Sequence, residues 1–260
     1  MFVVLAGLGF YAFNVPEMNA QVMPYWLLLL TGTLFTISAV IIKTVKPDIP
    51  FPGTAVFEKP LFDIGDFNFL YVVVPILVGL FLLASVGGHT QASLFGAPTF
   101  QAIEITSDVK GIITFFAANA EDIFFSGFMT PLIFGVAYYM LKDRLGRPNT
   151  EIVSALITLI LSPLIFMFYH FLRYGFTDVV SSTNVFVLGL IFCLWVLLTR
   201  NLIGPLAIHA GNNLGKFFYD AGLGSYASLM GWILILVVIV VTVFWYLRKR
   251  EDKSKVSWPP

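Results

Sequence analysis

The chain has 260 residues, of which 58% are hydrophobic and only 12% are charged, and its formal net charge is zero. This balance excludes a protein that binds nucleic acid through an excess of positive charge, and a mean hydropathy of +0.88 indicates a membrane protein.

Several apolar runs are long enough to cross a bilayer, whose core takes about 20 apolar residues in a helix. In chain order, we predict spans at Tyr25–Ile42, Asn68–Val86, Gly111–Leu141, Ile152–Phe171, Val179–Thr199, Asn201–Tyr219 and Leu223–Leu247. The shorter run Met1–Phe13 predicts a first short helix, because it lacks the basic start and cleavage site of a signal peptide. The sequence therefore predicts an all-α, polytopic membrane bundle of about eight transmembrane helices, forming one domain over residues 1–260.

The basic residues predict how the chain lies in the membrane. With eight spans, all of the 15 Lys and Arg residues except Lys110, Arg173 and Lys216 fall on one side. Because the cytoplasmic side of membrane proteins carries an excess of Lys and Arg, we predict both termini to be cytoplasmic in a cell-membrane protein, with a basic tail at 248–260. The lone Cys193 excludes an intramolecular disulfide.

Polar side chains inside three apolar segments are the strongest functional signal. They are Glu121 and Asp122, then His170, then His209 and Asn213. An ionisable group at the centre of a membrane helix costs roughly 2.5 to 3.5 kcal/mol on insertion, so such groups are functional candidates by default. Taken singly, each also has a structural interpretation, such as an acid that bonds between helices or a histidine that donates to a backbone carbonyl.

The spacing of these residues suggests their geometry. Glu121 and Asp122 are adjacent, so on a helix they point about 100° apart and only one can face a given cavity squarely. His209 and Asn213 are four residues apart and share a helix face, which Lys216 continues. An imidazole and an amide placed in this way form a candidate donor pair for an oxyanion.

Together the motifs Glu-Asp-x-x-x-Ser-Gly, Phe-x-x-x-His and His-x-x-x-Asn resemble those of the CAAX prenyl protease and bacteriocin-processing family, the intramembrane glutamate proteases that include the Ras-converting enzymes. The resemblance covers roughly residues 111–219, the core that carries the motifs. It implies a fold of about eight transmembrane helices, a water activated by Glu121 and His170, and an oxyanion stabilised by His209 and Asn213. Asp122, Phe166, Ser126 and Lys216 are the supporting residues that it suggests. We expect no cofactor and no metal, although Glu121, His170 and His209 are residue types that can ligate zinc.

Two positions depart from the family pattern. The family has a second glutamate where this chain has Asp122, and an arginine where it has Ser126. Losing a guanidinium near two carboxylates removes their counter-charge. Three outcomes stay open: Lys216 or Arg173 supplies the charge from another helix, the site is less anionic, or catalysis has been lost.

The leading hypothesis is an intramembrane endopeptidase that acts on a membrane-associated peptide or protein, with membrane lipid as its surroundings. The alternative is an inactive family member that serves as a scaffold among other membrane subunits. A proton-relaying transporter ranks third, because the sequence lacks internal pseudo-symmetry. In the predicted topology Glu121 and His170 lie nearer the face opposite the basic loops, which argues against a prenylated substrate presented from the cytoplasmic leaflet.

Overall fold

The computed structural model describes residues 64–89, 118–174 and 179–256, together with helical residues at 27, 30–34, 37–38, 41 and 44–45. Residues 118–124 are helical and lead directly into a wider helical turn. The elements are the 3₁₀ turn η1 (Gly65–Phe67), α3 (Leu70–His89), the π-helix η2 (Phe125–Met129), α5 (Thr130–Leu141), α6 (Arg147–Tyr174), α7 (Val179–Thr199), α8 (Ile203–Asp220) and α9 (Gly224–Val256). Over these residues the predicted all-α fold class is confirmed.

The protein is an integral membrane protein. Within the described ranges, five helical stretches are long and apolar enough to cross a bilayer: Gly65–Val86, Ala118–Leu141, Pro148–Leu172, Ser182–Thr199 and Gly224–Arg250. Each overlaps a predicted span. The predicted helix Met1–Phe13 lies outside the described residues and Tyr25–Ile42 lies largely outside them, so the count of eight is not confirmed.

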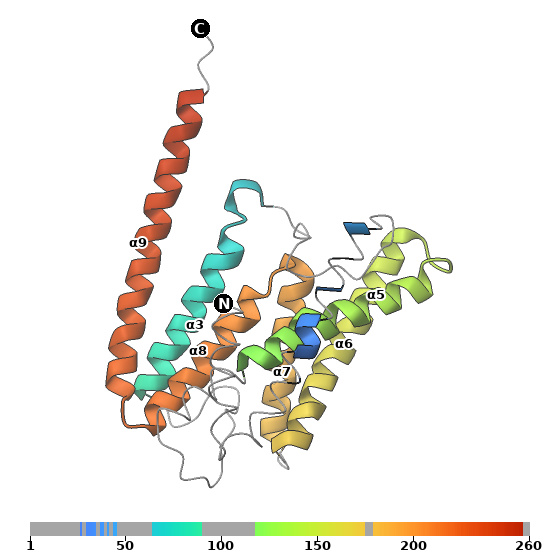
Figure 1. Ribbon diagram of the computed structural model, residues 1–260, viewed down its shortest axis with the longest axis horizontal. Helices are drawn as coiled ribbons and strands as arrows, with labels where there is room; N and C mark the ends of the chain where they lie inside the picture. The colour runs from blue at the N-terminus through green and yellow to red at the C-terminus, as the bar shows by residue number, and fades with distance from the viewer. Residues whose placement is uncertain are drawn as a thin grey trace.

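Helix α8 differs from the span that the sequence predicts at Asn201–Tyr219. It is helical over Ile203–Asp220, but it is not one of the five stretches that are apolar enough to cross a membrane unaided. The reason is its polar residues, among which His209, Asn212 and Asn213 are buried inside the protein. Helix α8 lies between α3 and α7 (Figure 1), so neighbouring helices enclose the polar face.

Helices α3 and α8 touch through their backbones. A Cβ atom added to Gly79 would lie 2.2 Å from the carbonyl oxygen of Ala207, and one added to Gly211 would lie 2.1 Å from that of Gly79. Small residues allow this close approach between membrane helices. Helix α9 packs along α3 as well, where Gly231 faces Ala84. Helices α3, α8 and α9 thus form one group.

Helices α5, α6 and α7 form the second group, beside the first in Figure 1. Thr130 of α5 and Ser162 of α6 share a hydrogen bond of 2.7 Å, and Gly189 of α7 faces Pro163 and Phe166 of α6. Pro163 lies inside α6 without ending it. The short helix over 118–124 is continuous with this group and carries Glu121 and Asp122.

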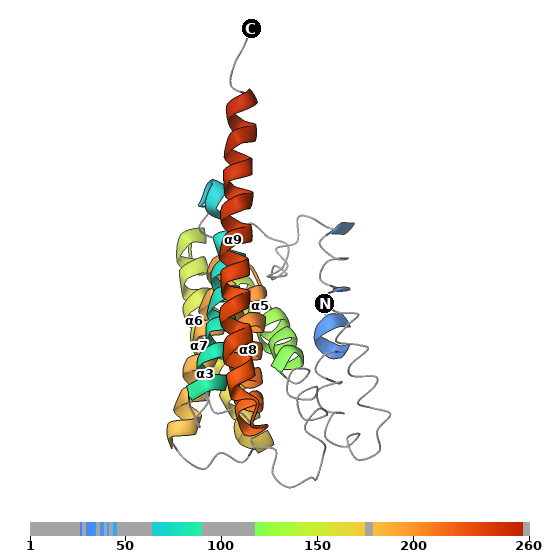
Figure 2. The same cartoon turned by 90° about the vertical axis from the view of Figure 1, so that its left-hand side faces the viewer.

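Helix α9 carries Arg248, Lys249 and Arg250 and extends beyond the bundle (Figure 2). Its apolar side chains are mostly exposed, as expected of a helix that faces lipid. Near its end, Lys249 pairs with Asp66 at 3.6 Å, and Trp245 packs edge-on against Phe69 with 5.1 Å between ring centroids. The start of α3 and the end of α9 therefore lie together.

Candidate active site

The two carboxylates lie on a buried helical segment that is built to pack closely. Glu121 and Asp122 are 2% and 0% exposed, and the neighbouring Ala118 and Ala120 are completely buried. The π-helix η2 begins at Phe125, directly after this segment. Single π-helical turns inside membrane helices are often found at functional sites, because they change which side chains face the interior.

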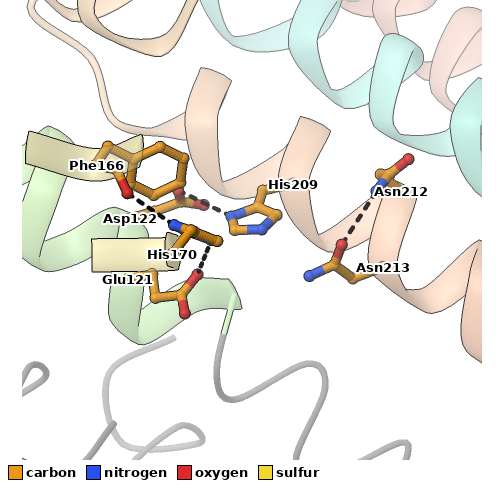
Figure 3. A network of polar contacts seen from close by, with 7 residues as sticks. All are labelled: Glu121, Asp122, Phe166, His170, His209, Asn212 and Asn213. Carbon is orange, nitrogen blue, oxygen red and sulfur yellow. Dashed lines mark hydrogen bonds and ion pairs between the residues drawn. The ribbon is translucent and has the colours of Figure 1, made fainter. Parts of the chain in front are cut away.

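Adjacent positions send the two carboxylates to different helices. Glu121 Oε2 lies 3.4 Å from His170 Nε2 of α6, whereas Asp122 Oδ1 lies 3.1 Å from His209 Nδ1 of α8. This follows from the angle of about 100° between neighbouring side chains on a helix. Figure 3 shows the two carboxylate–imidazole pairs close together. The site therefore contains two acid–histidine pairs.

The ring of His170 is held by its own helix. Its Nδ1 donates a hydrogen bond of 2.9 Å to the carbonyl oxygen of Phe166, one turn earlier in α6. A carbonyl can only accept, so the proton lies on Nδ1 and Nε2 is directed at Glu121. The hydrogen bond to a backbone carbonyl that the sequence suggests for a structural histidine is therefore present at His170. The same bond determines that Nε2, not Nδ1, meets the carboxylate of Glu121.

Aromatic rings pack against the two histidines. The Phe166 ring centroid lies 4.3 Å from that of His170 and 6.4 Å from that of His209. Phe192 of α7 adds a contact to His209 at 5.8 Å, and Phe125 packs on Phe166 at 5.2 Å. Phe166, a predicted supporting residue, thus contacts both imidazoles. These rings and their apolar neighbours keep the polar groups in a water-poor surrounding.

Asn213 lies one turn beyond His209 on the same face of α8, as the spacing predicts. Both side chains are 4% exposed. The Oδ1 of Asn213 accepts a hydrogen bond of 3.1 Å from Asn212 Nδ2. In Figure 3 the amide nitrogen of Asn213 is turned toward the side on which the histidines lie.

The structure does not bring Lys216 to the carboxylates. Lys216 forms an ion pair with Asp220, one turn further along α8. The side chain of Arg173, the other candidate counter-charge, lies outside the described residues. Ser126, which occupies the position of the family's arginine, is 4% exposed. Among the described side chains, the imidazoles of His170 and His209 lie against the two carboxylates.

Two residues of the site were not singled out from the sequence. Asn212 is 1% exposed and contacts Asn213, and Phe192 packs on His209. A signal existed for Asn212, because a second amide inside an apolar segment is as costly as the first. There was none for Phe192, because a phenylalanine in an apolar helix is ordinary.

Within the part of the chain that the structure describes, no three His, Cys, Asp or Glu side chains form a group that could hold a metal ion. Each carboxylate instead faces one imidazole. Asp122 Oδ2 is buried, and no described residue offers it a hydrogen-bond partner. A buried oxygen of this kind can accept a hydrogen bond from a water molecule or from a donor group of a substrate.

Comparison with known proteins bears on the same part of the chain. No curated protein and no solved structure matches it. One family model does match, and it spans the segment that carries all three motifs. Residues 110–215 match the family described as Type II CAAX prenyl endopeptidase Rce1-like, which confirms the resemblance predicted from the motifs.

Proposed function

We propose that the protein is an intramembrane endopeptidase in which Glu121 and His170 activate a water molecule. The family match suggests CAAX-type protease activity and a membrane-associated substrate. The observation that carries the finer proposal is the meeting of Glu121 Oε2 and His170 Nε2 at 3.4 Å inside a membrane protein. Buried ionisable groups from separate helices are expensive, and a catalytic role accounts for their placement.

The bond from His170 to Phe166 defines the chemistry of this pair. The mechanism requires the form of His170 that carries its single proton on Nδ1, because Nε2 then presents a lone pair next to the carboxylate of Glu121. A water molecule that donates one hydrogen to each of these acceptors has its own lone pairs directed away from them. As its oxygen attacks a peptide carbonyl, its proton passes to the Glu121–His170 pair, which later delivers it to the leaving amine. Such a positioned base contributes about 10² to 10⁴-fold to the rate.

His209 and Asn213 are the proposed oxyanion donors. Asp122 accepts the Nδ1 proton of His209, and a carboxylate at 3.1 Å favours the imidazolium form. The Nε2–H group of that imidazolium is then a donor, and the amide nitrogen of Asn213 is a second donor one turn away on the same face. Each donor of this kind is worth about 10² to 10³-fold.

A second candidate function is a non-catalytic scaffold in a larger membrane complex. The observation that favours it is Ser126 at the position of the family's arginine, combined with the pairing of Lys216 to Asp220. If this candidate holds, the two acid–histidine pairs act only as hydrogen bonds between helices. Stable co-purification with other membrane subunits, together with full tolerance of Glu121→Ala, would support it.

The deciding experiment is the substitution Glu121→Gln, which keeps the shape and removes the base. Two probes are used with the purified protein in liposomes and with membranes from producing cells. The first is a fluorescence-quenched peptide with a farnesylated cysteine followed by three residues, and the second is mass-spectrometric mapping of new peptide termini. We expect Glu121→Gln to lower cleavage at least about 100-fold.

The matched control is Glu151→Gln. Glu151 lies in the first turns of α6, about 28 Å along the helix from His170, so the same chemical change there should leave cleavage unaltered. Cleavage that is identical in wild type and Glu121→Gln, with either probe, would overturn the proposed activity and leave the scaffold.

A further inference from the structure

We infer that Asn212 is a positioning residue. It sets the direction of the Asn213 side-chain amide, so that the NH₂ group of Asn213 is directed toward the position of the oxyanion. This inference rests on the proposed function, because it assigns to Asn213 a donor role toward an oxyanion. It concerns a residue that the family motif leaves unspecified, since the motif requires only His209 and Asn213.

The contact itself is direct. Asn212 and Asn213 are adjacent on α8 and 1% and 4% exposed, and the Nδ2 of Asn212 donates to the Oδ1 of Asn213 at 3.1 Å. An amide has an accepting end and a donating end, and only the donating end can stabilise an oxyanion. With its oxygen engaged by Asn212, Asn213 must direct its nitrogen elsewhere, and Figure 3 shows that nitrogen on the side of the histidines.

The reverse orientation of Asn213 is disfavoured. With Asn212 oriented as in the structure, it would bring two NH₂ groups face to face and would lose the hydrogen bond. In a buried site the loss is not made up by water, so the cost is larger than on a surface. The bond therefore selects one of two orientations that are otherwise nearly equal in shape.

The bonding of Asn212 supports this role. Its own Oδ1 is buried, and among the described residues it has no hydrogen-bond partner. The side-chain hydrogen bond of Asn212 is thus the one that its Nδ2 donates to Asn213. A buried amide retained with one unsatisfied acceptor requires an explanation, and orientation of its neighbour provides one.

The backbone beneath the two amides is fixed. Gly211 precedes them directly, and a Cβ atom at this position would lie 2.1 Å from the carbonyl oxygen of Gly79 in α3. Helix α8 is therefore pinned against α3 at the residue next to Asn212. Because the backbone is rigid here, a single side-chain hydrogen bond is enough to fix the direction of the Asn213 amide nitrogen.

The test is a double-mutant cycle between Asn212 and Asn213, with the Glu121-dependent peptide from the experiment above as the probe. Asn212→Asp keeps the shape but offers only acceptors, so Asn213 should turn its nitrogen toward the new carboxylate and away from the oxyanion. We expect Asn213→Ala to lower kcat about 10² to 10³-fold, and Asn212→Asp to lower kcat by a similar factor with KM unchanged. Asn212→Leu, which merely frees the amide, should lower kcat about ten-fold.

The decisive comparison is made in the Asn213→Ala background. If Asn212 acts through Asn213, then Asn212→Asp and Asn212→Leu have no further effect there. A further loss would show that the new charge or the altered packing acts on its own, and that result would overturn the inference. Thermal unfolding of each variant checks that it is folded. If Asn212→Asp does not fold, the double-mutant cycle is measured with Asn212→Leu in its place.

The inference and the proposed function fail in different ways. If Glu121→Gln and Asn213→Ala abolish cleavage while Asn212→Asp cleaves like wild type, the inference is wrong and the protease assignment stands. If wild type and Glu121→Gln are equally active, or both inactive, the protease assignment fails and the role of Asn212 fails with it.

Discussion

Asp122 and His209 are separated by 87 positions in the chain, and their side chains meet with Oδ1 of the first 3.1 Å from Nδ1 of the second. Asp122 belongs to the segment that continues into α5, whereas His209 belongs to α8. The contact therefore joins the α3–α8–α9 group to the α5–α6–α7 group. Both side chains are almost completely buried, so water and salt do little to screen it.

Asp122→Asn tests whether this contact serves the reaction. The amide has the shape of the acid but no charge, so the imidazolium form of His209 loses its stabilising partner. We expect kcat for the Glu121-dependent peptide to fall about 10- to 100-fold, with cleavage at the same bond. The control is Asp220→Asn, which makes the same change in the pair with Lys216 near the end of α8. Equal activity of Asp122→Asn and Asp220→Asn would contradict a catalytic part for the buried pair.

Gly211→Ala tests the contact between α3 and α8. The added methyl group would lie 2.1 Å from the carbonyl oxygen of Gly79, so the two helices must move apart. We expect a loss of stability of about 1 to 3 kcal/mol together with reduced activity, because His209 moves with α8. Thermal unfolding in detergent provides the measurement. Gly146→Ala is the control, since no atom of the described residues beyond its chain neighbours lies within 4 Å of the new methyl group there. If both variants unfold at one temperature, the helices are not packed as described.

Thr130→Val tests the hydrogen bonds that join η2 to its surroundings. The Thr130 hydroxyl contacts Ser162 at 2.7 Å and donates to the carbonyl oxygen of Phe125 at 3.1 Å. Valine has the same shape without the hydroxyl and leaves these groups buried without this partner. We expect a cost of about 1 to 2 kcal/mol by thermal unfolding. Thr183→Val, at an exposed threonine of α7 that bonds only to its own helix, should cost clearly less. If the two variants lose the same unfolding free energy, the Thr130 hydrogen bonds stabilise the protein no more than the exposed bond of Thr183 does.

The sequence predicted the residue types of the site but not their partners. The adjacency of Glu121 and Asp122 implies that they face different ways. It does not say that α6 lies on the side of Glu121 and α8 on that of Asp122, because that depends on how the helices pack. The motif His-x-x-x-Asn specifies Asn213 and gives no role to its neighbour Asn212. The ion pair of Lys216 with Asp220 could be predicted from the sequence, since the two residues are four positions apart on one helix.

The fold was predictable where hydropathy decides it. Long apolar runs such as α9 and α7 correspond to predicted spans, because lipid imposes both their length and their composition. Helix α8 shows the limit of that argument. Its polar face is compatible with the membrane because other segments cover it, as Asp122 and Phe192 of α7 do at His209, and no local pattern reveals which neighbours a helix will have.

The division of the bundle into two groups has a consequence for how a bulky chain could reach the reacting groups. Glu121 and His170 both belong to the α5–α6–α7 side, whereas Asp122 and His209 bridge the seam. Separating the two groups of helices would therefore carry the proposed oxyanion donors of α8 away, while the proposed water-activating pair of Glu121 and His170 stayed assembled. If the proposed function holds, a polypeptide that entered between the two groups of helices could be cleaved only after they had closed around it.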